Sequence, residues 1–166
     1  MLPANLTPVE VFDLGIQGEL LAFRMYEALI RRIQVPTVQT RLNQLKRDEK
    51  EHRKTLRAHR RALFPDEGPT ISEQDAERVF GKVDLASIRD KDSLIQALYG
   101  AIRFEEYGSY FYDKTQFKVA SPEARIFMEV LANEGRTHAS ILKQQIEAVR
   151  LMEVHVDDRG RAVEVP

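Results

Sequence analysis

The chain has 166 residues and a formal net charge of −1, with 43% hydrophobic and 31% charged residues. A charge so near zero gives no electrostatic reason to expect nucleic acid or an anionic membrane as a partner. The absence of cysteine excludes disulfides, thiolate zinc sites, cysteine-ligated iron–sulfur clusters and a cysteine nucleophile.

The length and composition predict a single domain over residues 1–166 with a core of its own. No stretch approaches the roughly 20 apolar residues needed to cross a bilayer. The first residues also lack the basic and apolar regions of a secretory signal, so we expect a location in the cytoplasm.

A first helix is predicted over residues 8–34, where Thr7 can cap the start and Pro8 suits the first helical position. Its apolar stripe advances in steps of four and three and contains one carboxylate, Glu19, among Phe12, Ile16, Phe23, Tyr26, Ile30 and Ile33. Pro36 ends this helix. The short connection predicts that a second helix, over residues 38–63, is its antiparallel neighbour.

The second helix has a stripe of the same kind, formed by Leu42, Leu45, Glu49, His52, Leu56, His59 and Leu63. Burying an unpaired carboxylate is costly, so Glu49 needs a compensating partner. Glu-x-x-His on the inward face of a bundle helix is one known arrangement of metal ligands, which makes Glu49 and His52 candidates. His59 fits a satisfied core histidine better than a further ligand, and the basic residues off the stripe predict a solvated face.

Residues 64–91 interrupt the helical pattern with prolines and glycines and predict a long crossover, which includes a short helix near residues 72–80. Two more helices are predicted over residues 92–117 and 122–151. A tail at 153–166 follows and is expected to be irregular or packed over the surface. The sequence therefore predicts an all-α fold, a four-helix bundle whose long crossover joins the second and third of these helices.

The two helical hairpins repeat one pattern of polar residues. Glu19 precedes Tyr26 by seven residues, as Glu105 precedes Tyr112, and a histidine follows each of these glutamates by 33 residues. In a four-helix bundle, one level of the core could then receive six side chains: Glu19, Glu49, His52, Glu105, Glu134 and His138. Four such carboxylates are not expected to stay charged together without cations. A shell of carboxylates and imidazoles suits two ions of iron or manganese.

Two further assignments follow from the same helix faces. Glu106 is an alternative to Glu105 as the ligand from the third helix. Tyr26 and Tyr112 are expected to be packing residues whose hydroxyl groups bond to a group beside the metals, rather than redox participants.

At these positions the chain resembles the ferritin-like di-iron carboxylate family, and within it the rubrerythrin-like branch, over roughly residues 8–150. The resemblance implies a ferritin-like bundle that holds two iron ions, with manganese or zinc as alternative metals. It also implies a reaction with peroxide or dioxygen and assembly as a homodimer.

The resemblance also implies a role for each matching residue. Glu19 and Glu105 correspond to terminal carboxylates, and Glu49 corresponds to a bridging one. His52 and His138 correspond to the imidazole ligands.

The chain departs from the family pattern at two glycines. The family's second Glu-x-x-His would require a glutamate at Gly135, and here Glu134 lies one residue earlier, four before His138. Both spacings lie on one helix face, so Glu134 is expected to substitute, unless the second half-site is degraded. The family's additional carboxylate on the third helix falls at Gly108.

The predicted function is that of a rubrerythrin-like oxidoreductase, a di-iron peroxidase or oxidase whose catalytic group is the metal centre. Because the chain lacks the cysteines of a rubredoxin-type module, its electrons would come from a separate donor protein. Two alternatives remain open. One is an iron-binding or storage protein without turnover, and the other is a metal-free helical interaction module, which Gly135 favours.

Overall fold

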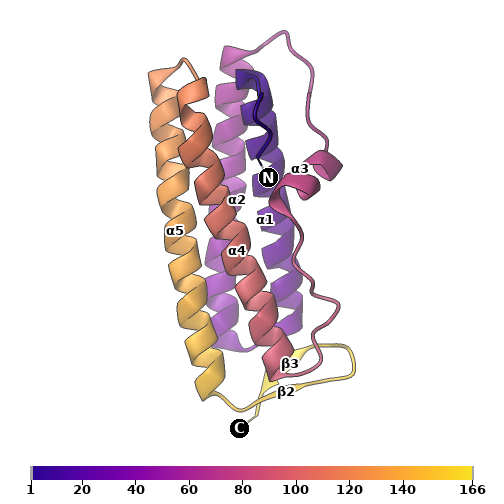
Figure 1. Cartoon of the computed structure of the whole chain (residues 1–166). Helices are drawn as coiled ribbons and strands as arrows, with labels where there is room; N and C mark the ends of the chain where they lie inside the picture. Colours follow the sequence, from indigo (N-terminus) through magenta and orange to yellow (C-terminus); the bar gives the residue numbers. More distant parts are fainter. Residues whose placement is uncertain (1, 166) are drawn as a thin grey trace.

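Four long helices lie side by side in the computed structural model of the protein, which describes residues 2–165 (Figure 1). The described elements also include a short helix in the crossover and a 3₁₀ turn before the last helix. Their bounds are α1 Pro8–Arg32, α2 Pro36–Leu63, α3 Glu73–Phe80, α4 Lys91–Thr115, the 3₁₀ turn Gln116–Lys118, and α5 Pro122–Leu151. The prediction of an all-α four-helix bundle with a long crossover is confirmed.

Capping residues explain where the helices begin. The side-chain oxygen of Thr7 accepts the backbone N–H of Glu10 at 3.3 Å, and the Glu10 carboxylate accepts the N–H of Thr7 at 2.8 Å. This reciprocal pair is a capping box. Asp90 and Ser93 form another one, which starts α4 one residue before the expected position. The second long helix begins at Pro36 rather than at residue 38, because proline suits the first turn of a helix.

The C-terminal tail departs from the expected irregular segment and forms part of a small sheet. Its strands are β1 Ile33–Gln34, β2 Val154–Val156 and β3 Ala162–Glu164, in the order β1-β3-β2. β3 pairs in parallel with β1 and antiparallel with β2. Two valine-containing segments on either side of a turn favour a hairpin. Because Ile33 and Gln34 form β1 and pair with β3, α1 ends at Arg32, two residues before the predicted end.

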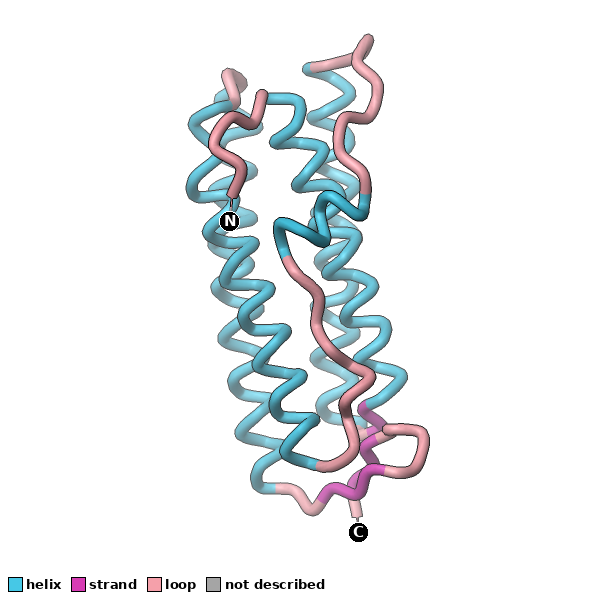
Figure 2. The backbone as a smooth tube through the Cα atoms, turned by 45° about the vertical axis from the view of Figure 1, so that its right-hand side comes forward, coloured by secondary structure: helices cyan, strands magenta, loops and turns pink. Residues whose placement is uncertain are grey.

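The crossover runs along one side of the bundle, with α3 partway along its course (Figure 2). An ion pair between Arg24 and Glu73 joins α3 to α1, and the side chain of Ala76 is fully buried. α3 therefore lies against the bundle as a fixed cover rather than as a free loop. Within the described part of the chain, no helix is long and apolar enough to cross a membrane.

Gly160 sits in the turn between β2 and β3 with a φ of +68°, a conformation that L side chains rarely adopt. A Cβ atom at this position would lie 2.6 Å from Nη1 of Arg32 and 3.0 Å from the carbonyl oxygen of Ile88. We expect Gly160→Ala to lower the free energy of unfolding by about 2 kcal/mol through strain and crowding. Thermal unfolding measures this loss. Gly68→Ala is the control, because a Cβ there meets no atom within 4 Å, and equal melting temperatures would contradict the prediction.

Candidate metal centre

Five of the six predicted ligand residues come together in one buried cluster. Their exposed fractions lie between 3% and 9%: Glu19, Glu49, His52, Glu105 and His138. They form two groups of three, in which one donor atom per residue lies within 4.8 Å of the others: Glu19–Glu49–His52 and Glu49–Glu105–His138. Glu49 belongs to both groups, which is the place expected of a carboxylate shared by two metal ions.

The two imidazoles present the same ring nitrogen to the carboxylates. Nδ1 of His52 lies 3.3 Å from Oε2 of Glu19 and 3.3 Å from Oε2 of Glu49. Nδ1 of His138 lies 2.8 Å from Oε1 of Glu49 and 3.6 Å from Oε1 of Glu105. The rings are nearly parallel, with an interplanar angle of 14° and centroids 5.8 Å apart. The two hairpins therefore offer similar half-sites on either side of Glu49.

Two buried tyrosines hold the outer carboxylates from the opposite hairpin. The hydroxyl of Tyr112 donates to Glu19, and the hydroxyl of Tyr26 donates to Glu105. Burial, together with the neighbouring glutamates, raises the pKa of both tyrosines well above 10. The hydroxyls thus remain donors at neutral pH and fix the orientation of the two carboxylates.

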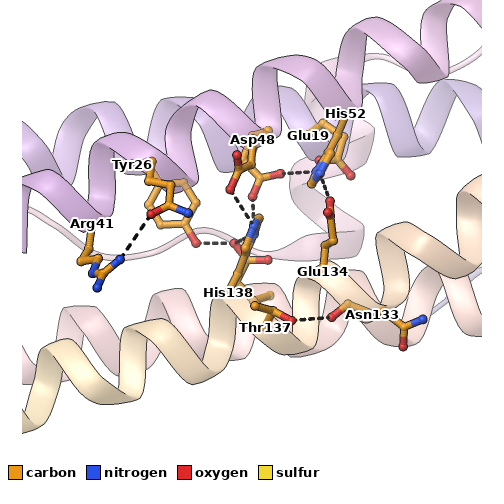
Figure 3. A network of polar contacts seen from close by, with 12 residues as sticks. Glu19, Tyr26, Arg41, Asp48, His52, Asn133, Glu134, Thr137 and His138 are labelled. Atoms are coloured by element: carbon orange, nitrogen blue, oxygen red, sulfur yellow. Dashed lines mark hydrogen bonds and ion pairs between the residues drawn. The ribbon is translucent and has the colours of Figure 1, made fainter.

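Glu134, the sixth predicted residue, lies at the edge of the cluster, where it contacts the second ring nitrogen of His52 (Figure 3). Its carboxylate contacts Nε2 of His52, and Oδ2 of Asp48 lies 3.4 Å from Nε2 of His138. Each acid precedes the histidine of its own helix by four residues. Asp48 is therefore the repeat counterpart of Glu134. Asp48 is not among the residues predicted from the sequence, although the same four-residue spacing identifies it.

Close packing of α4 and α5 explains the glycine in the second half-site. A Cβ atom at Gly135 would lie 3.2 Å from the carbonyl oxygen of Glu105 and 3.2 Å from Cβ of Ser109. A side chain at this position would require α4 to move by a few tenths of an ångström, so the observed approach of the two helices favours glycine, which leaves Glu49 without a counterpart on α5. A Cβ at Gly108, in contrast, would meet no atom within 4 Å.

Two residues for which the sequence offered alternatives lie outside the cluster. The exposed Glu106 carboxylate is 3.1 Å from Nζ of Lys143, so α4 directs Glu105 rather than Glu106 toward the other ligands. His59 is half-buried, and its ring packs against Phe127 with centroids 5.5 Å apart.

The sequence model of the rubrerythrin family matches residues 10–146, which include every residue of the cluster. The chain belongs to the rubrerythrin family. A hypothetical protein from Pyrococcus furiosus has a similar structure, with a TM-score of 0.75 and 22% identity over 89% of this chain and 92% of that one. This likeness supports the fold alone. No curated protein matches the sequence significantly.

Membership of the rubrerythrin family and the buried glutamate–histidine cluster together indicate a metal site. Burial and the negative charges of Glu105 and Glu19 raise the pKa of Glu49 well above 4.5. Burial alone would lower the histidine pKa values, but hydrogen bonds with the glutamates raise the pKa of His52 and of His138 to about 11. In the metal-free protein, the positive charges of the protonated imidazoles therefore balance the negative charges of the carboxylates. Bound cations would take over this role.

We expect Glu134→Gln to weaken metal binding to this rubrerythrin by about 10- to 100-fold. The Glu134 carboxylate at Nε2 of His52 favours a proton on that nitrogen. Nδ1, which faces Glu19 and Glu49, is then unprotonated and can bind a metal ion. Titration calorimetry with manganese measures the affinity.

Glu106→Gln is the matched control, because it also neutralises a partly exposed glutamate. Equal affinities of the two variants would contradict the prediction. Complete loss of one bound ion would instead assign Glu134 as a metal ligand.

Proposed function

We propose that this rubrerythrin-family protein binds two iron ions between its hairpins and reduces peroxide or dioxygen. One observation carries the metal site. Three buried carboxylates and two buried imidazoles converge in two groups, and within each group the donor atoms lie within 4.8 Å of one another. Carboxylates buried so close together are costly, and two bound cations would compensate their charge.

The donor atoms fit the metals that the family implies. Three carboxylates and two imidazoles supply only oxygen and nitrogen, a set that suits iron and manganese and also accepts zinc. Glu19 and His52 would serve one ion, Glu105 and His138 the other, and Glu49 would lie between them. Two bound ferrous ions would supply the two electrons that convert peroxide and two protons to water.

The protein's own residues orient the side chains that would bind the metals. Tyr112 and Tyr26 fix the outer carboxylates, and Glu134 and Asp48 contact the histidine nitrogens that face away from the cluster. Such outer contacts set the tautomer and ring position of a ligating histidine. The arrangement is therefore organised before a metal arrives.

The proposal includes partners that supply electrons and complete the assembly. The sequence has no cysteine for an iron–sulfur module, so a separate donor protein would return the metals to the ferrous state. A homodimer and a cytoplasmic location remain predictions from the sequence. Analytical ultracentrifugation tests the first of them.

Anaerobic loading with ferrous iron tests the function. We expect about two irons per chain, and oxidation by hydrogen peroxide that is faster than that of free ferrous iron under the same conditions. Oxidation no faster than that of free iron would overturn the redox proposal. Absence of bound metal after reconstitution would favour the interaction module.

Iron binding without turnover is the second candidate, and Gly135 is the observation that favours it. Because Gly135 offers no carboxylate opposite Glu49, the cluster has one fewer carboxylate that could bind both metal ions than a symmetric site would have. Iron that binds and is oxidised once, but that no added chemical reductant returns to the ferrous state, would support this candidate.

A further inference from the structure

A small cavity adjoins the metal cluster on the side covered by the crossover. Its volume is about 30 Å³, and besides the ligands its walls include Gly18, Ala22, Phe80, Phe104, Gly108 and Leu131. A cavity of this size holds about two water molecules. Bound metals would take up part of it, so the room left for an oxidant is smaller still.

Phe80 forms the wall that the crossover contributes. It is the last residue of α3, and its ring is 8% exposed. The ring packs edge-on against Phe111, with centroids 5.3 Å apart, and against Tyr107, with centroids 5.9 Å apart. A third contact, to Phe104, has centroids 5.9 Å apart. Aromatic neighbours from α4 therefore hold the ring in one position.

Gly18 on α1 makes room for this ring. A Cβ atom at Gly18 would lie 2.8 Å from Cε2 and 2.9 Å from Cζ of Phe80. These distances are too short for an ordinary contact, so the ring fills the space that any other side chain at this position would need. Phe80 thus reaches between α1 and α4 and covers the cavity beside Glu19 and Glu105.

We infer that Phe80 is a specificity-determining residue that restricts the site to dioxygen and hydrogen peroxide and excludes alkyl and aryl hydroperoxides. The inference rests on the proposed function of the same site. A substituted hydroperoxide carries a carbon group that the cavity cannot hold while the Phe80 ring is in place. Moving the ring would break its packing against α1 and α4.

A binding experiment without turnover tests the inference. Azide and phenol both give charge-transfer absorption when they bind ferric iron, but only azide is narrow enough to enter beside Phe80. We expect the ferric wild type to bind azide and not phenol. Phe80→Ala should raise the affinity for phenol by at least about tenfold. Phe117→Ala is the control, because this phenylalanine is 74% exposed.

Gly108→Ala keeps the test decisive if Phe80→Ala does not fold. Gly108 lines the cavity, and a Cβ there meets no atom within 4 Å, so the added methyl group would take up part of the cavity without contact with the metal ligands. Azide affinity should fall by at least about tenfold with unchanged metal content. Unchanged azide binding in this variant would overturn the inference, and so would equal phenol binding by wild type and Phe80→Ala.

Stopped-flow oxidation of the ferrous protein separates this inference from the proposed function. We expect wild type to react with hydrogen peroxide but not with cumene hydroperoxide, and Phe80→Ala to react with both. Wild type that reacts equally with both oxidants would overturn the size restriction. Wild type that reacts with neither would overturn the proposed function, while the azide and phenol titrations would still decide the role of Phe80.

Discussion

Glu49→Gln is expected to abolish metal binding at both positions, from about two ions per chain to none. Glu49 is the one residue that belongs to both groups of potential ligands. Glutamine has nearly the same shape, but it offers one neutral oxygen where the carboxylate offers two charged ones. Metal analysis after equilibrium dialysis measures the loss.

Single replacements of the outer carboxylates provide matched controls. Glu19 belongs to one group and Glu105 to the other, so Glu19→Gln and Glu105→Gln should each retain about one ion per chain. Glu49→Gln that keeps both ions would show that Glu49 is not shared. A Glu19→Gln variant as empty as Glu49→Gln would show that the two positions fill only together.

The same replacement should have the opposite effect on the metal-free protein. Glu49 is 3% exposed and lies among other carboxylates, an arrangement that opposes folding when no cation is bound. Urea unfolding of metal-free Glu49→Gln should therefore give a free energy equal to or greater than that of metal-free wild type. With each metal ion at 1,000 times its dissociation constant, wild type should gain about 4 kcal/mol per bound ion, or about 8 kcal/mol for two, and the variant should gain nothing.

Helical periodicity predicts the five buried residues of the cluster, because each of them lies on an apolar stripe. Glu19 and Glu105 are lone acids on such stripes, and the spacing between Glu49 and His52 places both on one helix face. The hairpin repeat then brings the two halves to one level. These features depend on distances along the chain, which the sequence contains.

The remaining features depend on how elements far apart in the sequence pack together. Phe80 reaches the site because α3 lies across α1 and α4, and no local pattern defines where a crossover helix rests. The pairing of Ile33 with Ala162 joins residues that are far apart in the sequence. The sequence shows that position 135 is a glycine, but the close approach of α4 to Gly135 depends on the packing of two helices, which a single helix does not reveal.

A buried ion pair away from the candidate metal centre should be costly to break in the metal-free fold. Asp13 on α1 is 7% exposed, and its carboxylate accepts from Nε of Arg60 at 2.8 Å and from Nη2 at 3.1 Å. It also accepts from the backbone N–H of Thr70 at 2.9 Å and from its hydroxyl at 2.7 Å. One side chain therefore joins α1, α2 and the crossover.

We expect Asp13→Ala to lower the free energy of unfolding by about 3 kcal/mol, because removing one partner of a buried pair leaves the other charge uncompensated. Arg60 keeps hydrogen bonds to backbone carbonyls of the crossover, which places the loss at the lower end of the usual range. Urea unfolding at neutral pH measures it. Glu51→Ala removes an exposed pair with Lys54 and should change stability by less than about 0.5 kcal/mol. Equal losses in the two variants would contradict the prediction.

The contribution of Asp13 should depend on pH in a defined direction. Burial alone would raise its pKa, but hydrogen bonds from Arg60 and Thr70 outweigh burial and lower the pKa below 3.8. A carboxylate whose pKa is lower in the folded than in the unfolded state stabilises the fold above the unfolded value. This stabilisation is lost as the pH falls through the folded value. The difference in unfolding free energy between wild type and Asp13→Asn should therefore be constant above about pH 5 and shrink in acid below about pH 4. A difference that persists unchanged at pH values well below 3.8 would mean that neutral hydrogen bonds, rather than the charge of Asp13, hold the crossover to the bundle.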